Sequence, residues 1–250
     1  MCIRDRYEVV EDEHGGYMLN SKDMCLLPRL PDLLNLGMDS LKVEGRNKTE
    51  YYAAVVARTY RQAIDDYYSD PRHWDFRRYM DDLYTLQNRG YCLGFHDGKL
   101  TNISQNYEYT RTLGDWLFAG SIVEWQGNQA IFEIRNYIDK GEFIEFLLPG
   151  TLDNLRITFD EFEDADSGEI TAKVSAGQGK KIRIDFNKCK IQYCRNEKEE
   201  PKTAPELNIE NIKELLPQYC IARKPAPLTG ENRTMLDHKK AEFTQLCNRE

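Results

Sequence analysis

The sequence predicts an α/β segment, then an all-β segment, then a helical tail. Before about residue 86, stretches with a helical apolar stripe flank one short run of alternating polarity at residues 39–46. From Trp116 on, short runs rich in valine, isoleucine and aromatic residues alternate with turns built on Gly, Asn and Asp. Two helix-like stretches follow, at 208–216 and 230–249.

Composition narrows the class of protein. The 250 residues allow one or two domains, and 30% charged with 40% apolar residues is an ordinary globular balance. No run approaches the roughly 18 apolar residues that span a bilayer, and the first residues lack the apolar core of a signal peptide. We therefore expect a cytoplasmic protein without a membrane partner. The net charge of −8 argues against indiscriminate nucleic-acid binding and against DNA as a partner, but leaves a local basic face open.

The first residues look foreign to the rest of the chain. Residues 1–6 (Met-Cys-Ile-Arg-Asp-Arg) resemble the translation of a sequencing-library transposon end, and we expect them to be an artefact. The natural protein would then continue upstream of Tyr7. Composition shifts divide the remainder into an α/β segment at 7–112, a β-rich segment at 116–196, and a charged linker with a helical tail at 197–250.

A helix, a short strand and a long helix follow one another in the α/β segment. The first helix ends at Gly37, the strand covers 39–46, and Thr49 caps a helix that continues to about Tyr68. In an α/β barrel or an open α/β sheet, the residues just past such a strand lie at the catalytic face. The end of this strand is therefore the first candidate for a site.

Three ionisable side chains lie at that strand end. Lys42 and Glu44 share one face of the strand by its period of two, and Arg46 follows them in the turn. Such a set can bind a carboxylate ligand, orient a base or transfer a proton. The alternative is a structural ion pair that closes the barrel, or a solvent-exposed turn.

Cysteine usage is that of a protein with reduced thiols. Seven cysteines occur, at positions 2, 25, 92, 189, 194, 220 and 247, and none forms a C-x-x-C pair. We expect most of them to be buried and chemically silent. Cys25 follows a polar turn, but a metal-binding role needs further ligands that no downstream cysteine cluster supplies. The sequence also lacks His-Glu-x-x-His, Gly-x-Ser-x-Gly and a Walker-type phosphate loop.

The β-rich segment is divided by charge. Turn signals between its short runs predict hairpins that form a small antiparallel barrel over 116–196. Residues 133–170 contain eleven Asp/Glu and three Lys/Arg, whereas residues 171–195 contain seven Lys/Arg and one acidic residue. This pattern indicates either a solvated charged surface or a basic face for RNA phosphates. On the second interpretation, the nucleic-acid-binding residues are Lys180, Lys181, Arg183, Lys188 and Lys190.

Three motifs together resemble a known family. They are NSKDMCLL at 20–27, GMDSLKVEGR at 37–46 and the run from Tyr52 to Asp65. Their order and their residues are similar to those of the collagenase-like peptidase family U-32. The likeness is highly specific over residues 7–70 and looser through 89–95. The likeness resumes around Arg135, Gly141 and Glu145, in the part that corresponds to the family's C-terminal barrel.

The resemblance implies an RNA-modifying hydroxylase. Better-understood members of the family hydroxylate tRNA wobble uridine, ribosomal-RNA cytidine or the ubiquinone ring, and the appended β-rich segment is typical of the tRNA 5-hydroxyuridine branch. Residues 7–112 would be the C-terminal part of a TIM-like α/β barrel, followed by the small antiparallel barrel. Cys25 would be the fourth ligand of a 4Fe-4S cluster whose other three cysteines lie upstream. Lys42, Glu44 and Arg46 would line the pocket for the base or for a carboxylate co-substrate, with prephenate as the candidate.

Two other functions stay open. The family's older name implies a peptidase, which no catalytic set in the sequence supports. A non-enzymatic RNA-binding module is the third possibility, because the 250-residue chain would hold only one of the expected cluster ligands and would be inactive by itself. tRNA is the expected partner in the leading hypothesis.

Overall fold

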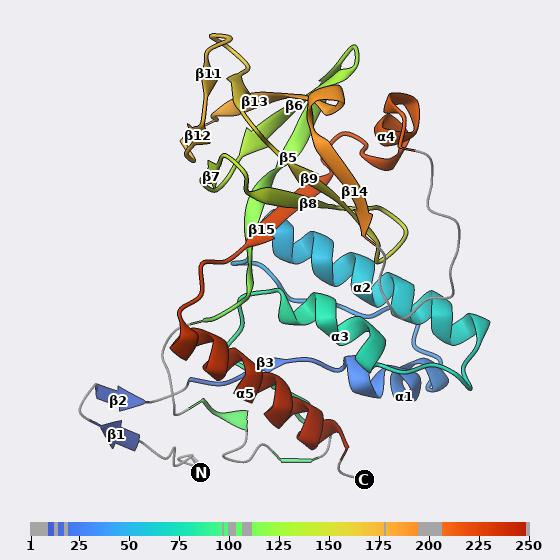
Figure 1. Ribbon diagram of the computed structural model, residues 1–250. Helices are drawn as coiled ribbons and strands as arrows, with labels where there is room; N and C mark the ends of the chain where they lie inside the picture. Colours follow the sequence, from blue (N-terminus) through green and yellow to red (C-terminus); the bar gives the residue numbers. More distant parts are fainter. Residues whose placement is uncertain are drawn as a thin grey trace. The chain divides into compact units, whose positions relative to one another are not determined.

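A computed structural model describes residues 10–12, 15–17, 20–96, 98–99, 104–106, 112–177, 179–194 and 207–248. The expected artefact at 1–6 and most of the expected linker lie outside these residues. The chain forms two compact units (Figure 1). We call Ser40–Leu86 with Trp116–Ala226 the sheet unit, and Met1–Asp39 with Gln87–Asp115 and Pro227–Glu250 the tail-helix unit.

The sheet unit is built on a nine-stranded antiparallel sheet. Its strand order is β11-β10-β13-β6-β5-β15-β8-β9-β14. The strands are β5 (Trp116–Gln126), β6 (Gln129–Ile134), β8 (Phe143–Leu147), β9 (Asn154–Thr158), β10 (Phe162–Asp164), β11 (Ile170–Thr171), β13 (Lys181–Asp185), β14 (Lys190–Cys194) and β15 (Ile221–Pro225). The antiparallel prediction is confirmed. The predicted closed barrel is wrong, because within the described residues this order has two unpaired ends, β11 and β14.

A strand from the tail lies in the middle of this sheet. Ala222 of β15 is paired with Gly120 of β5 on one side and with Phe146 of β8 on the other. Sequence patterns did not indicate this strand, because Ile-Ala-Arg-Lys-Pro places two cations and a proline where a central strand ordinarily carries apolar residues. The tail is therefore part of the sheet and not only helical.

The core of the sheet unit is one apolar cluster. It draws fully buried side chains from β5, β6, β8, β9 and β13, such as Phe132, Phe146 and Ile182. Ile212 and Leu216, within and just after α4 (Ile209–Leu215), join the same cluster. A 3-10 turn, η3 (Phe186–Lys188), leads into β14, and β7 (Ile138–Asp139) pairs with β12 (Lys173–Val174) as a separate small sheet.

Two helices complete the sheet unit. The long helix α2 (Glu50–Ser69) begins as predicted, since the Thr49 hydroxyl accepts from the Tyr52 N–H, and it buries a stripe that includes Val55, Thr59 and Ala63. A shorter helix, α3 (Arg77–Tyr84), follows within the range predicted to be helical. The strand predicted over 39–46 is wrong: this segment is irregular, and no described strand pairs with it.

The tail-helix unit contains the start and the end of the chain. Strands β1 (Val10–Asp12) and β2 (Gly15–Tyr17) form an antiparallel pair, and β3 (Asp23–Met24) pairs in parallel with β4 (Tyr91–Cys92). The turn η1 (Leu27–Arg29) and α1 (Leu30–Asn35) come next, and Gly37 follows α1 with a φ of 71°, as expected for a residue that ends a helix. The last helix is α5 (Gly230–Cys247). No helix in the described ranges has the length and apolar character to cross a bilayer.

Gly120 offers a direct test of the sheet. A Cβ at this position would lie 2.1 Å from the Glu133 carbonyl oxygen and 2.7 Å from the Phe132 ring, inside the β5–β6 pair. We expect Gly120→Ala to lower the free energy of unfolding by about 3 kcal/mol or more, because backbone and a buried ring must both move. Chemical denaturation measures this change.

Gly127 provides the matched control. It lies in the β5–β6 turn with a φ of 59°, and a Cβ there meets nothing within 4 Å. Gly127→Ala should cost only the backbone strain, roughly 1–2 kcal/mol. Equal losses for the two variants would contradict the described pairing of β5 with β6.

Candidate functional site

The loop from Lys42 to Arg46 is exposed to solvent. The side chains of Lys42 and Glu44 are 87% and 66% exposed, and Lys42 Nζ lies 3.8 Å from Glu44 Oε2. The backbone N–H of Arg46 donates to Glu44 Oε1 at 3.2 Å. The structure therefore brings the three predicted residues together in one loop, with Glu44 at its centre. A loose ion pair this exposed contributes little to stability, which leaves its charged groups available to a ligand.

The start of α2 holds this loop in place. The hydroxyl of Tyr52 donates to the Glu44 carbonyl oxygen at 3.3 Å. Gly45 lies directly against the same ring, since a Cβ on Gly45 would come within 2.6 Å of Tyr52 Cε1. The loop is thus fixed by its backbone while its ionisable side chains point into solvent, which suits the binding of an anionic small molecule.

Cys25 belongs to the tail-helix unit, where it is buried. It is 3% exposed, and its backbone N–H donates to the Cys92 carbonyl oxygen at 2.9 Å, which extends the parallel pairing of β3 with β4. Its neighbour Asp23 is bound by Arg89, whose Nη2 donates to Asp23 Oδ1 at 2.8 Å. The segment that carries Cys25 is therefore well anchored.

Helix α5, near the C-terminal end of the sequence, also contacts the segment that carries Cys25. The ammonium of Lys22, whose side chain is 6% exposed, pairs with Glu242. Lys239 is 3% exposed and donates from Nζ to the Asn88 carbonyl oxygen at 2.8 Å. The ring of Phe243 lies 5.6 Å from that of Tyr91 on β4. Three side chains of the tail thus secure the strands that flank Cys25.

The described residues do not by themselves fit an iron–sulfur cluster. Such a cluster takes four cysteine thiolates, and within the described ranges no group of three or more His, Cys, Asp or Glu side chains could hold a metal ion. Cys92 Sγ donates instead to the Lys22 carbonyl oxygen at 3.9 Å. Elsewhere, burial raises the pKa of the Cys189 and Cys220 thiols to about 12, which keeps both neutral.

The charge contrast in the β-rich segment is largely resolved by cross-strand pairing. Arg183 on β13 donates from Nε to Glu163 Oε1 on β10 at 3.1 Å, and Lys173 Nζ lies 3.3 Å from Asp139 Oδ1. Lys180 Nζ lies 3.8 Å from Asp164 Oδ2. These pairs join the acidic run to the basic run, so Lys173, Lys180 and Arg183 have carboxylate partners.

Lys188 and Lys190 are the exposed remainder of that face. Both lie around the start of β14, an edge strand of the sheet, and neither forms an ion pair among the described residues. Lys181 is half-buried on β13. Of the five predicted nucleic-acid contacts, Lys188 and Lys190 are thus the two that are both exposed and outside the ion pairs found among the described residues.

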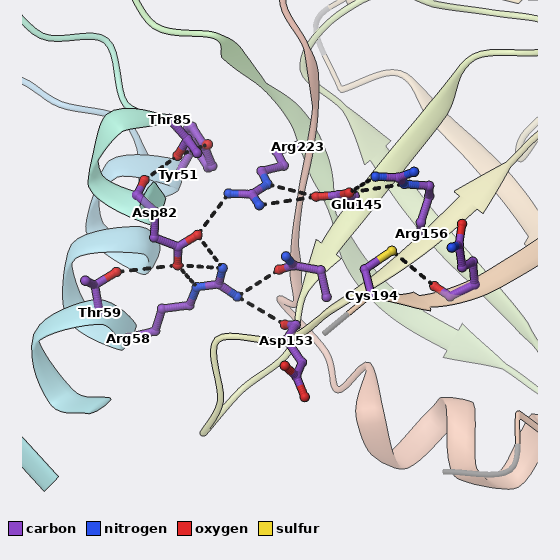
Figure 2. A network of polar contacts seen from close by, with 12 residues as sticks. Tyr51, Arg58, Thr59, Asp82, Thr85, Glu145, Asp153, Arg156, Cys194 and Arg223 are labelled. Carbon is purple, nitrogen blue, oxygen red and sulfur yellow. Dashed lines mark hydrogen bonds and ion pairs between the residues drawn. The ribbon is translucent and has the colours of Figure 1, made fainter. Parts of the chain in front are cut away.

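A buried polar network ties the helices of the sheet unit to the sheet (Figure 2). Arg58 of α2 forms a bidentate pair with Asp82 of α3. Its Nε donates to Oδ2 at 2.8 Å, and its Nη2 donates to Oδ1 at 2.9 Å. Arg223 of β15 donates to the same carboxylate at 3.1 Å and to Glu145 of β8 at 3.2 Å. Arg156 of β9 donates to the other oxygen of Glu145 at 3.1 Å. Five charges of alternating sign thus run from α2 to β9.

The network is closely packed and fully bonded. Arg58, Asp82, Glu145 and Arg223 have side chains 4–9% exposed, and within the described residues none of their polar atoms is buried without a partner. Burial lowers the pKa of Arg58, although Asp82 opposes this effect. The guanidinium carbon of Arg223 lies over the Trp116 ring, 4.3 Å from its centroid. Since every group is used by another, the network is a structural clamp and not a site open to ligands.

Sequence patterns did not single out this network. Its signals were present but weak: Arg58 interrupts the apolar stripe of α2, Asp82 adjoins Leu83, and Arg223 follows the apolar pair Ile221–Ala222. Charged residues at such positions are ordinarily exposed. Their partners come from far apart in the sequence, so only the fold shows that they meet.

Two family models match the chain. The model described as "Peptidase family U32" matches residues 2–106, and the one described as "Peptidase family U32 C-terminal domain" matches residues 115–195. The chain therefore belongs to peptidase family U32, which confirms the resemblance of its motifs. The first match includes residues 2–6, and β15 and α5 lie outside both matches.

Curated relatives add proteins named for tRNA hydroxylation. The chain is 36% identical over 157 residues to "tRNA hydroxylation protein P" of Escherichia coli, a stretch that covers 62% of this chain and 34% of that protein. It is 27% identical over 177 residues to "tRNA hydroxylation protein P1" of Bacillus subtilis, covering 70% and 42% respectively. It is 26% identical over 99 residues to "Collagenase" of Porphyromonas gingivalis, covering 39% and 24%.

The chain spans about a third of the length of the first of these relatives. No solved structure matches it.

Lys239 makes the attachment of α5 sensitive to pH. Burial lowers the pKa of Lys239 to about 8, an effect that Asp23 opposes and Lys22 reinforces. The folded chain therefore loses this proton at lower pH than the unfolded chain does. Below pH 8 the buried cation costs stability, and between about pH 8 and 10 that cost is relieved, so the free energy of unfolding should rise with pH.

Lys239→Met tests this expectation, because it keeps the apolar stem and removes the titrating group. Denaturant unfolding of both proteins from pH 7 to 10 should show wild-type stability gaining about 1–2 kcal/mol relative to the variant as pH rises above 8. A difference that stays constant across this range would contradict the buried position of Lys239.

Proposed function

We propose that this chain is part of a tRNA-hydroxylating enzyme that converts a wobble uridine to 5-hydroxyuridine. The observation that carries the proposal is the chain's membership of family U32 together with its likeness to proteins named for tRNA hydroxylation in several bacteria. The reaction replaces the C5–H of the base by C5–OH, a two-electron oxidation. A co-substrate must therefore either transfer an oxygen atom and be reduced by two electrons, or accept the two electrons while water supplies the oxygen. A tRNA substrate also implies a cytoplasmic location.

Lys42, Glu44 and Arg46 are the proposed pocket residues. Two cations and a carboxylate on one fixed loop suit a co-substrate that bears carboxylates, and prephenate is our candidate. The anchoring of the loop by Tyr52 supports this assignment, since a binding loop needs a fixed backbone. The exposure of Lys42 means that its removal should affect ligand binding and not folding.

Cys25 is the proposed ligand of a 4Fe-4S cluster. The remaining thiolates would come from outside the described residues, and we expect turnover to require them. We also propose that residues 7–112 complete a TIM-like α/β barrel, and the parallel pairing of β3 with β4 supports this, because a parallel ladder is the pairing that such a barrel uses. When bound, the cluster would supply electron transfer.

Lys188 and Lys190 are the proposed phosphate contacts to tRNA, and Lys181 of β13 is a further candidate. Their exposure at the edge strand β14 supports the proposal. Lys180 and Arg183, which are held by carboxylates, have a lesser part in it. Each phosphate contact that is lost should weaken binding and flatten its dependence on salt.

Deletion of the gene from its host tests the function. Liquid chromatography–mass spectrometry of the nucleosides from total tRNA measures the outcome. The deletion strain should lack 5-hydroxyuridine, and the wild-type gene should restore it. Cys25→Ser should fail to restore the nucleoside and should lose iron and acid-labile sulfide from the purified full-length protein. Lys42→Ala should lower the nucleoside without a change in melting temperature.

Cys92→Ser is the matched control, since Cys92 is equally buried in the neighbouring strand. It should keep its iron and its activity. Normal 5-hydroxyuridine in the deletion strain would contradict the tRNA assignment. If the purified protein then cleaved gelatin, and Glu44→Gln abolished that cleavage, the peptidase named by the family would be the correct function.

A further inference from the structure

Tyr219 has an unusual backbone conformation. Its φ is 68°, and among the described residues it is the only one besides glycine with a positive φ. This left-handed region crowds the Cβ of any L-residue against its own backbone, so glycine is the residue that ordinarily occupies it. A tyrosine here carries a strain that glycine would not.

Hydrogen bonds hold the turn that contains Tyr219. Its N–H donates to the Ile122 carbonyl oxygen at 2.7 Å, and the Ile122 N–H donates to the Cys220 carbonyl oxygen at 3.0 Å. The Gln218 side chain donates to the Val123 carbonyl oxygen at 2.7 Å. The turn between α4 and β15 is therefore pinned to β5, and it presents Tyr219 from a rigid support.

Tyr219 lies mostly in solvent. The residue is 69% exposed, among the most exposed large hydrophobic residues in the described part of the protein. Burial therefore does not explain why a strained position holds a large aromatic side chain. A contact with a partner outside the chain does, because strained residues persist where they serve binding.

The surroundings of this turn are aromatic and carry charges of both signs. Trp125 donates from Nε1 to the Leu216 carbonyl oxygen, just before the turn, and Lys213 of α4 lies over its indole, 5.6 Å from the ring centroid. The other neighbour of Trp125 is Phe186, whose ring stacks on it at 5.3 Å. Phe186 begins η3, the turn that ends at Lys188 and leads to Lys190.

We propose that Tyr219 is a stacking platform for an unpaired base of the RNA substrate. Exposed aromatic rings on rigid supports, with lysines beside them, are what proteins use to hold bases that have left a helix. Lys188, Lys190 and Lys213 would contact the adjoining phosphates. The exposed carboxylates of Glu124 and Glu214 come from the same elements, so the contribution of this turn is stacking more than charge. The inference rests on the proposed tRNA function and adds a binding residue outside both family matches.

The test compares two substitutions of Tyr219, one that removes the aromatic ring and one that keeps it. Tyr219→Gly removes the ring and the backbone strain together, so it should leave the fold intact and raise the melting temperature by about 1–4 °C. It should weaken binding of a host tRNA transcript to the 250-residue chain by roughly 5- to 100-fold at fixed salt. Tyr219→Phe keeps the stacking face and should bind within about twofold of wild type.

Two controls separate stacking from charge and from exposure. The slope of binding against salt should be unchanged in Tyr219→Gly, whereas a Lys188→Ala/Lys190→Ala double variant should flatten it. Tyr68→Ala removes a ring that is 67% exposed but lies in regular helix, and it should not alter binding.

Wild-type affinity in Tyr219→Gly, with tRNA bound by both proteins, would overturn the stacking role and leave the proposed function standing. Absence of tRNA binding by the wild-type chain would overturn both the stacking role and the RNA contacts proposed for this chain, while hydroxyuridine in the deletion strain would still report separately on the function.

Discussion

The sheet unit depends on one buried carboxylate, that of Asp82. It accepts from Arg58 of α2 and from Arg223 of β15, and Arg223 in turn reaches Glu145 of β8. Charges buried to this degree are costly unless each is paired and fully bonded. Removing any one of them leaves its neighbours uncompensated, so the arrangement tolerates only one docking of the helices on the sheet. Its contribution is specificity of packing as much as stability.

This constraint makes the tail part of the functional architecture. β15 lies outside both family matches, yet it is a central strand of the sheet and carries Arg223. Through α2, the same clamp fixes the Lys42–Arg46 loop to the frame that presents Lys188, Lys190 and Tyr219. In the tail-helix unit, α5 secures the segment of Cys25 in a comparable way. The C-terminal residues thus support the candidate site without belonging to the family's recognised domains.

Local signals in the sequence predicted the local structure. Thr49 as the cap of α2, Gly37 as the end of α1 and the apolar runs of the β-rich segment correspond to the elements found. The predictions that failed concern features that depend on residues far away in the sequence. The sequence of β15 looks like that of a polar loop, because the residues that neutralise its cations lie far away in the sequence. The pairing of Arg183 with Glu163 was missed for the same reason, since the two residues meet only through strand register. Alternation predicted a strand at 39–46, but none of the described strands pairs with that segment.

The most direct test of this account is the coupling energy between Asp82 and Arg223. A double-mutant cycle with Asp82→Asn and Arg223→Met, measured by denaturant unfolding, isolates the interaction from the other effects of each substitution. The exposed pair Arg61–Asp65 on α2, with side chains 61% and 58% exposed, is the internal reference. We predict a coupling of about 2–3 kcal/mol for the buried pair and less than about 0.5 kcal/mol for the exposed one. Equal couplings would show that the buried network does not hold the helices to the sheet.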